Sequence, residues 1–178
     1  ALVLIPEISL TPQTEKRFRD RFNVQVAMLH SGLTDQERLE SWAQAATADA
    51  AIILGTRSAV FTPLKNPGII IIDEEHDQSY KQQDGFRYSA RDLAVIRAKQ
   101  ENIPIILGSA TPSLESLHNC DKKRYQHLIL NTRAGDAKPP TWSMVDLKTE
   151  QVESGVAAST LNAIREAIHN KQQVLVFL

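Results

Sequence analysis

The chain has 178 residues, a length that suits one domain or one and a fraction. Apolar residues make up 42% and charged residues 23% of the sequence, the composition of an ordinary globular protein. Its 20 basic and 21 acidic side chains exclude a uniformly basic nucleic-acid-coating protein but leave room for a local basic stripe. The single cysteine, Cys120, excludes a disulfide framework and an all-cysteine zinc site within this chain.

Short runs rich in Ile, Leu and Val alternate with longer amphipathic runs. The run 68–73 is almost continuous in isoleucine, which is typical of a strand buried on both faces of a parallel sheet. Strands that alternate with helices predict an α/β fold with a doubly wound, mainly parallel sheet and helices on both faces. The predicted strands are 1–5, 24–29, 50–54, 68–73, 104–108, 125–130, 142–147 and 173–178.

Five stretches between these runs carry helix signals. Thr11 before Pro12 predicts an N-cap with proline at the first helical position. Residues 34–37 form a capping box, and we expect the apolar face of the helix that follows, with Trp42, to lie in the core. Three further helices are predicted over 88–101, from 111–112 onward, and around 161–168.

Residues 131–141 hold one glycine and two prolines and show no apolar periodicity, which is typical of a linker. We therefore expect one domain over 1–130 and the start of a second over 142–178. Both ends of the chain read as buried strands, whereas domain ends usually lie in polar linkers, so we expect a fragment of a larger protein. No run reaches the ~18 apolar residues of a membrane span, and no signal peptide is present, which indicates a cytoplasmic protein without membrane partners.

Four isoleucines lead directly into Asp73-Glu74-Glu75-His76. These side chains are expected at the carboxyl end of a buried strand, the edge where ligands bind in open α/β sheets. An aspartate there can hold Mg²⁺, and a neighbouring glutamate can orient and deprotonate an attacking water. His76 could couple the carboxylates to the rest of the site. A solvated acidic turn is the other interpretation.

Other predicted strands also end in polar segments. Ser109-Ala110-Thr111 could hydrogen-bond to an adjacent catalytic loop and relay its state, or could simply cap a helix. Residues 6–13 and 55–58 offer hydroxyls, amides and helix N-termini on which a phosphate backbone can lie, or are plain loops. His30 follows another strand, where a histidine is more often an ordinary polar loop residue.

Residues 79–99 combine aromatic and basic side chains, with five basic against two acidic residues. Basic residues between aromatic ones suit single-stranded nucleic acid, which needs both charge neutralisation and stacking faces. The alternative is a loop whose aromatic rings pack inward beneath a basic helix. The aromatic residues at the start of the stretch are Tyr80, Phe86 and Tyr88.

Taken in order, these blocks resemble the motifs of superfamily 2 helicases: residues 6–13 resemble motif Ia, 55–58 motif Ib, 73–76 motif II (the Walker B box) and 109–111 motif III. Longer phrases resemble the bacterial replication-restart helicases and are much more specific. The resemblance covers nearly the whole chain and is weakest over 118–160. The phrases are LHSGL at 29–33, GTRSAVF at 55–61, DEEHDQSYKQQDG at 73–85, RYSARDLAV at 87–95 and GSATPSLESL at 108–117.

The resemblance implies a RecA-like helicase lobe over 1–130 and the start of a second such lobe over 142–178. It implies an ATP-dependent DNA helicase that moves 3′ to 5′ with Mg²⁺, restarts stalled replication forks and initiates primosome assembly. Asp73 would help to hold Mg²⁺ and Glu74 would activate water, with Glu75 and His76 in the same catalytic box. Residues 109–111 would couple hydrolysis to movement. The implied DNA contacts are Pro6, Glu7, Thr11, Gln13, His30, Gly55, Thr56, Arg57, Ser58, Tyr80, Lys81, Phe86, Arg87 and Tyr88.

The resemblance also implies partners and missing parts. Single-stranded and forked DNA, other primosome proteins and single-strand DNA-binding protein would be partners of a monomeric helicase. No G-x-x-x-x-G-K-[ST] phosphate-binding loop occurs in the sequence. That loop, the arginine finger and the zinc module of the family would lie outside this chain, so we expect the isolated chain to be inactive.

Two other functions compete with a helicase motor. A metal-dependent nuclease could use Asp73, Glu74 and Glu75, although a two-metal nuclease needs further carboxylates from other strands. An ATP-independent DNA-binding or interaction module could keep the fold without hydrolysis, although the intact Asp73-Glu74 pair argues against it. DNA-stimulated ATP hydrolysis without strand cleavage would separate the three.

Overall fold

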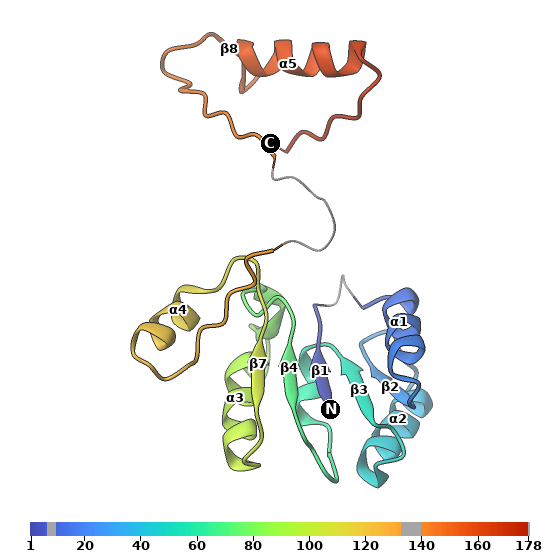
Figure 1. Cartoon of the computed structure of the whole chain (residues 1–178). Coiled ribbons are helices and arrows are strands. Elements are labelled where there is room, and N and C mark those ends of the chain that lie inside the picture. The colour runs from blue at the N-terminus through green and yellow to red at the C-terminus, as the bar shows by residue number, and fades with distance from the viewer. Residues whose placement is uncertain (7–9, 133–139, 178) are drawn as a thin grey trace. The chain divides into compact units, whose positions relative to one another are not determined.

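The computed structural model describes residues 1–6, 10–132 and 140–177. It divides into two compact units, Ala1–His127 and Leu128–Leu178, and each is described by itself (Figure 1). The domain boundaries predicted from the sequence stay predictions, and most of the predicted linker, 133–139, lies outside the described residues.

The first unit is built on a sheet of five parallel strands in the order β2-β3-β1-β4-β7. Each strand lies where the apolar runs predict one. The register sets Leu2 of the central strand between Ile53 and Ile70. The strands are β1 (Leu2–Leu4), β2 (Val26–Leu29), β3 (Ile52–Gly55), β4 (Ile70–Ile72) and β7 (Ile105–Leu107).

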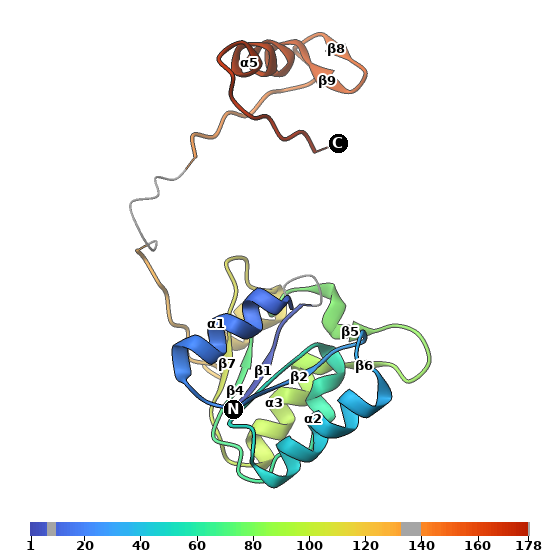
Figure 2. The ribbon, with the colours of Figure 1, turned by 90° about the vertical axis from the view of Figure 1, so that its right-hand side faces the viewer.

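Helices cover both faces of this sheet, because successive strand residues point to opposite sides. Leu4, Ile53 and Ile72 belong to the buried cluster shared with α2 (Asp35–Thr47) and α3 (Ala90–Gln100). Val3 and Leu54 belong to a second cluster, against which Phe18 of α1 (Pro12–Phe22) packs. Figure 2 shows α1 on the opposite side of the sheet from α2 and α3. The predicted doubly wound α/β sheet is confirmed.

Capping side chains define where these helices begin. The backbone N–H of Thr14 donates to the Thr11 side chain at 3.3 Å, as predicted. The capping box of Thr34 and Glu37 is also confirmed. The helix predicted to open at 111–112 is wrong by two residues: α4 spans Leu114–Asp121, because the Ser113 hydroxyl accepts the N–H of Ser116.

The apolar face expected for α2 is wrong. Trp42 is 41% exposed and Leu39 is 70% exposed. Ala45 is the buried residue of the helix. A methyl side chain at this position lets the helix backbone approach the sheet closely, so the neighbouring large side chains remain at the surface.

The second unit contains a hairpin of β8 (Val152–Glu153) and β9 (Val156–Ala157) followed by α5 (Ala158–His169). The strands predicted at 125–130, 142–147 and 173–178 do not form among the described residues, and Leu178 lies outside them. Leu130, Met144 and Leu175 are at least 95% exposed. A strand needs a neighbour to pair its backbone groups, and the described residues provide none beside these runs. None of the described helices has the length and apolar character of a membrane span.

Candidate functional site at the carboxyl edge of the sheet

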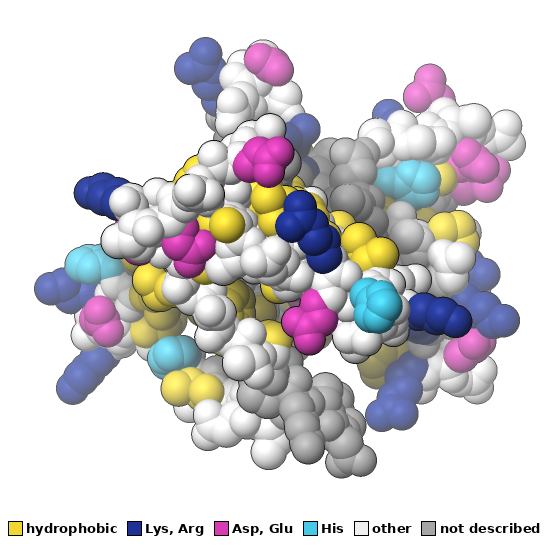
Figure 3. Space-filling view, turned by 90° about the horizontal axis from the view of Figure 1, so that it is seen from above, with side chains coloured by type: hydrophobic (Ala, Val, Ile, Leu, Met, Phe, Trp, Pro, Cys, Tyr) yellow, Lys and Arg dark blue, Asp and Glu magenta, His cyan; other side chains and the backbone are white. Residues whose placement is uncertain are grey.

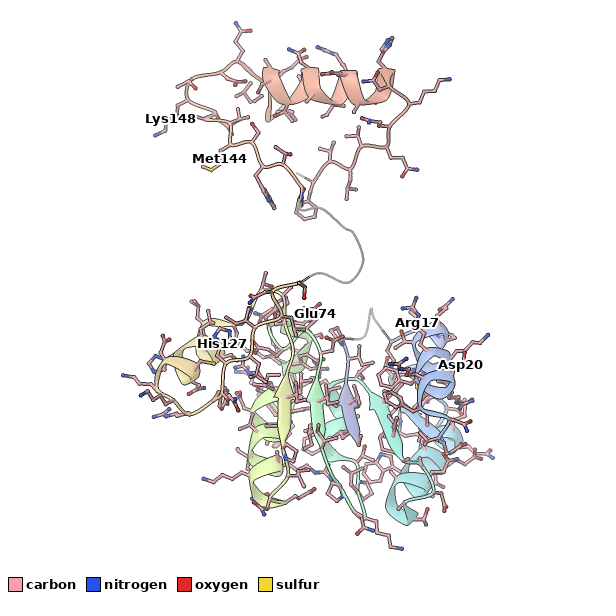
Figure 4. The ribbon with its side chains drawn as sticks, viewed as in Figure 1. Arg17, Asp20, Glu74, His127, Met144 and Lys148 are labelled. Atoms are coloured by element: carbon pink, nitrogen blue, oxygen red, sulfur yellow. The ribbon has the colours of Figure 1, made fainter. Side chains whose placement is uncertain are left out.

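The carboxyl ends of the parallel strands bring the predicted segments to one edge of the first unit, as the rule for open α/β sheets requires. Residues 55–58 begin at the last residue of β3, 73–76 follow β4 and 108–111 follow β7. Figure 4 shows Glu74 at this end of β4, apart from Arg17 and Asp20 on α1. Pro6 follows β1 and is buried, and Glu7 lies outside the described residues.

The acidic turn, residues 73–76, contains one strained residue. Glu74 has a φ of 46°, in the left-handed region that non-glycine residues rarely adopt. The Asp73 carboxylate accepts the N–H of Glu74 at 3.1 Å, and the N–H of Asp77 donates to the Glu74 carbonyl at 2.8 Å. Such a conformation costs on the order of 1–3 kcal/mol and persists only where the surroundings hold it, which occurs most often at functional sites.

Asp73 suits a role in binding Mg²⁺. Its carboxylate is exposed, at the end of a buried strand. Among the residues described, no group of three or more His, Cys, Asp or Glu side chains could hold a metal ion. Magnesium is commonly bound through one or two carboxylates together with waters and substrate phosphates, so this donor set fits Mg²⁺ that arrives with a nucleotide.

Glu75 faces the interior. It is 3% exposed, and its carboxylate accepts the N–H of Ser113 at 2.6 Å, the hydroxyls of Ser113 and Ser116, and the guanidinium of Arg91 at 3.1 Å. Burial alone would raise the pKa of Glu75, but these hydrogen bonds outweigh it and hold the pKa below its usual value. Both carboxylate oxygens accept hydrogen bonds from within the protein, so we do not expect Glu75 to contact substrate.

His76 joins the acidic turn to the segment after β7. Its Nδ1 lies 2.7 Å from the Ser109 hydroxyl and 3.5 Å from the Glu74 carboxylate, and its Nε2 lies 3.3 Å from the Thr111 hydroxyl. The backbone reinforces this junction, because the N–H of Glu75 donates to the carbonyl of Gly108 at 3.0 Å. Ala110 is exposed between the two hydroxyl residues.

Tyr80 lies in the core instead of offering a stacking face. It is 2% exposed, and its hydroxyl donates to the carbonyl of Asp73 at 2.7 Å. Burial and the nearby carboxylates of Asp73, Asp77 and Glu74 raise the pKa of this phenol well above its ordinary value. The bulk of the ring is enclosed, so the expectation that Tyr80 contacts DNA is not retained.

The hairpin after Tyr80 is exposed and aromatic. Its strands, β5 (Lys81–Gln82) and β6 (Tyr88–Ser89), pair antiparallel, and Figure 2 shows the connecting loop extending from the first unit. Phe86 is 78% exposed, and its ring centroid lies 6.0 Å from that of Tyr88. Phe61, which sequence reasoning missed, lies edge-on to Tyr88 at 5.0 Å. These three rings form what we call the aromatic cluster.

Residues 55–58 support this hairpin. Arg57 opens a short 3-10 helix, η2 (Arg57–Phe61), and donates to the carbonyls of Ser79 at 3.0 Å and Lys81 at 3.2 Å. Gly55 and Thr56 are buried, so only Arg57 and Ser58 of this segment reach the surface. Figure 3 shows both basic and acidic side chains at the surface of the described residues, in line with the near-neutral total charge.

The remaining predicted contacts lie after β2 and in the first turn of α1. The His30 ring accepts the N–H of Gly32 at 3.1 Å, and Gln13 is exposed in the first turn of α1. Arg91, Ser113 and Ser116, the partners of Glu75, carried no separate sequence signal. In the sequence, Arg91 was noted only as one of the basic residues of 79–99. Its ion pair with Glu75 spans 16 residues and forms only when α3 packs, so the sequence did not predict it.

Comparison with protein families matches residues 1–120 to the DEAD/DEAH box helicases. The chain belongs to this family, and the match together with the five-stranded parallel sheet confirms the RecA-like fold.

Comparison with individual proteins identifies a more specific group of relatives within this family. The chain is 50% identical over 177 residues to the replication restart protein PriA of Haemophilus influenzae, covering 99% of the chain and 24% of the relative. It is 41% identical over 182 residues to PriA of Bacillus subtilis, covering 100% of the chain and 22% of that protein. It is 45% identical over 186 residues to PriA of Synechocystis, covering 99% of the chain and 22% of that protein. The predicted resemblance to replication-restart helicases is confirmed, and the chain spans about a quarter of the length of these relatives.

Proposed function

We propose that this chain forms part of the motor of an ATP-dependent DNA helicase that moves 3′ to 5′, restarts stalled replication forks and initiates primosome assembly. The observation that carries the proposal is the acidic turn at the sheet edge, where Asp73 and strained Glu74 are linked through His76 to Ser109 and Thr111. Membership of the helicase family and the similarity to replication restart proteins support it.

Asp73 and Glu74 divide the chemistry of hydrolysis between them. In the assembled protein Asp73 holds Mg²⁺, which neutralises charge on the nucleotide phosphates. Glu74 orients the attacking water and accepts its proton. The left-handed conformation at Glu74 changes the direction of the backbone after β4. The neighbouring carboxylates of Asp73 and Glu74 can therefore have different roles.

His76, Ser109 and Thr111 act as the relay between hydrolysis and movement, with Ala110 in the same segment. Their hydrogen bonds connect the ends of β4 and β7. A change in the position of Glu74 alters its 3.5 Å contact with His76 and reaches the second strand end through the imidazole.

The DNA-binding surface comprises the aromatic cluster and the polar strand ends. Phe86 and Tyr88 offer faces on which bases stack without regard to sequence. Lys81 and Arg87 are exposed and neutralise backbone phosphates. Further contacts come from Glu7, Thr11, Gln13, His30, Arg57 and Ser58, whereas Pro6, which is buried, acts by shaping the chain after β1. Gly55 and Thr56 act by supporting the loop.

The wider assignment follows from the same proposal. The assembled helicase is a cytoplasmic monomer that binds single-stranded and forked DNA, other primosome proteins and single-strand DNA-binding protein. It uses ATP and Mg²⁺, and its zinc site lies outside this chain. The isolated chain, which has no phosphate-binding loop sequence, neither hydrolyses ATP appreciably nor unwinds DNA.

Glu74→Gln in a full-length protein that contains this chain tests the proposal. The variant should bind ATP normally but hydrolyse it roughly 10²-fold more slowly, as expected for the loss of a general base. Glu40→Gln, an exposed site on α2, is the matched control. Near-normal ATPase activity of Glu74→Gln would refute the role of Glu74, and Mg²⁺-dependent strand cleavage by the wild type would support the nuclease alternative. DNA binding without ATPase activity would support the binding module.

A further inference from the structure

The carboxylate of Glu75 is the centre of a buried network that takes no part in the chemistry described above. It accepts four hydrogen bonds: from the backbone N–H of Ser113 at 2.6 Å, the Ser113 hydroxyl at 3.0 Å, the Ser116 hydroxyl at 2.9 Å and the guanidinium of Arg91 at 3.1 Å. A carboxylate offers about four acceptor positions, so its whole capacity is taken up inside the protein. We call Glu75, Arg91, Ser113 and Ser116 the Glu75 network.

The Glu75 network joins three elements that are distant in the sequence. Glu75 lies beyond the end of β4, Arg91 lies in the first turn of α3, and Ser113 and Ser116 begin α4. Arg91 and Ser116 are each 8% exposed. Removing one partner from such a buried ion pair is costly, because the remaining charge has no water to solvate it. The network therefore resists displacement of residue 75.

The end of α4 that faces Glu75 is its N-terminus. A helix N-terminus has free N–H groups and a partial positive charge, which favour a carboxylate. Ser113 serves both the helix and the turn, because its hydroxyl accepts the N–H of Ser116 at 3.3 Å and donates to Glu75 at 3.0 Å. The start of α4 and the position of Glu75 therefore depend on the same two serines.

The backbone of residue 75 is fixed as well. The N–H of Glu75 donates to the carbonyl of Gly108 at 3.0 Å, and the N–H of Gly108 donates to the carbonyl of Ile72 at 2.8 Å. These two bonds continue the pairing of β4 with β7 past the ends of the strands. Glu75 is thus held by both main chain and side chain, whereas the side chain of Glu74 is 44% exposed.

Glu74 needs a support of this kind. Its φ of 46° is a conformation that persists only where the surroundings impose it. Because residue 75 is fixed, the peptide after Glu74 cannot rotate toward a relaxed conformation without breaking hydrogen bonds of the Glu75 network. The direction in which the Glu74 carboxylate leaves the chain is therefore determined by the position of Glu75.

We propose that Glu75, Arg91, Ser113 and Ser116 are positioning residues that hold Glu74 in the conformation in which it activates water. The inference rests on the proposed function, because it concerns the same hydrolysis step. None of the four side chains touches substrate. Their role does not involve nucleic acid, so they set the rate of hydrolysis equally with and without DNA.

Ser116→Ala in a full-length protein that contains this chain tests the inference. Alanine removes one donor to Glu75 and favours the helical conformation, so α4 is retained. The kcat of ATP hydrolysis should fall roughly 2- to 10-fold, the effect of one hydrogen bond. The KM for ATP and the ratio of DNA-stimulated to basal kcat should stay unchanged. Ser41→Ala, the same substitution on α2, is the matched control and should leave kcat unchanged.

A double-mutant cycle separates positioning from a general loss of stability. In the Glu74→Gln background, Ser116→Ala should have no further effect on kcat, because the group that it positions is already absent. Ser113→Thr, which keeps the hydroxyl, should retain more of the rate than Ser113→Ala. Amide hydrogen exchange, measured without nucleotide or DNA, should be faster in Ser116→Ala over residues 73–77 and unchanged over β2.

Three results would overturn the inference. The first is an unchanged kcat in Ser116→Ala. The second is a fall in kcat that is equally large in the Glu74→Gln background, and the third is faster exchange throughout the first unit, since either would mark a general loss of stability. If Glu74→Gln itself hydrolyses ATP at a near-normal rate, the proposed role of Glu74 fails and the inference fails with it. Failure in the serine variants alone refutes only the inference.

Discussion

The exposed ring of Phe86 allows DNA coupling to be separated from folding. At 78% exposure the side chain contributes little burial, and its ring centroid lies 6.0 Å from that of Tyr88. Phe86→Ala should therefore leave the free energy of unfolding nearly unchanged. Losing one base-stacking contact costs about 1–3 kcal/mol locally, which corresponds to roughly 5- to 150-fold in a single-contact equilibrium. Total DNA affinity should fall less, because other segments share the binding.

The assay is steady-state ATP hydrolysis by a full-length protein that contains this chain, titrated with single-stranded DNA. Phe86→Ala should reduce the stimulation by DNA sharply while the basal rate changes far less. Phe22→Ala is a matched control, since Phe22 is 55% exposed on α1 and pairs with Phe18 at a centroid distance of 5.9 Å. If basal and stimulated rates of Phe86→Ala fell together, or if neither changed, the ring would be a packing element and the reasoning would be refuted.

Two further predictions concern the stability of the chain itself. Gly55→Ala should destabilise it by about 1–3 kcal/mol in urea unfolding, because the new Cβ would lie 2.7 Å from the Leu29 carbonyl; Gly68→Ala, which has no atom within 4 Å of its Cβ, should be near neutral. Because the folded-state pKa of Glu75 is lowered, its contribution is complete above its unfolded value of about 4.3 and is lost as pH falls through the folded pKa. The unfolding free energy of Glu75→Gln, measured by the same method from pH 7 to pH 3, should therefore fall less steeply on acidification than that of the wild type, and identical slopes would contradict this.

The sequence allowed the fold and the edge of the site to be predicted, for physical reasons that apply locally. Ile70–Ile72 is apolar on both faces, which requires a covered parallel strand. Parallel strands must end at one edge, so the residues after β3, β4 and β7 had to lie near one another. The caps at Thr11 and Thr34 depend on residues within one helical turn, and both were correct.

What could not be predicted depends on contacts between distant residues. The inward direction of Glu75 follows from Arg91 and Ser113, which lie 16 and 38 residues away. Trp42 was expected in the core because it lies on the apolar face of α2. Which face of a helix contacts the sheet is decided only when the helix packs, so this prediction was wrong. The strands expected at 142–147 and 173–178 require pairing partners, and apolar composition alone does not supply a partner.

The position of β1 at the centre of the sheet has a kinetic consequence. Leu2 pairs with Ile53 and with Ile70, so this strand remains unpaired on both edges until residues 52–55 and 70–72 are available. At the usual rate of synthesis, about 5–20 residues per second, the second neighbour follows after roughly 3–14 s. During that interval the run Leu2-Val3-Leu4-Ile5 has at least one open edge, which makes it a site for association with other chains. Folding of this unit is governed by long-range pairing and should be slow compared with that of a helical bundle of equal length.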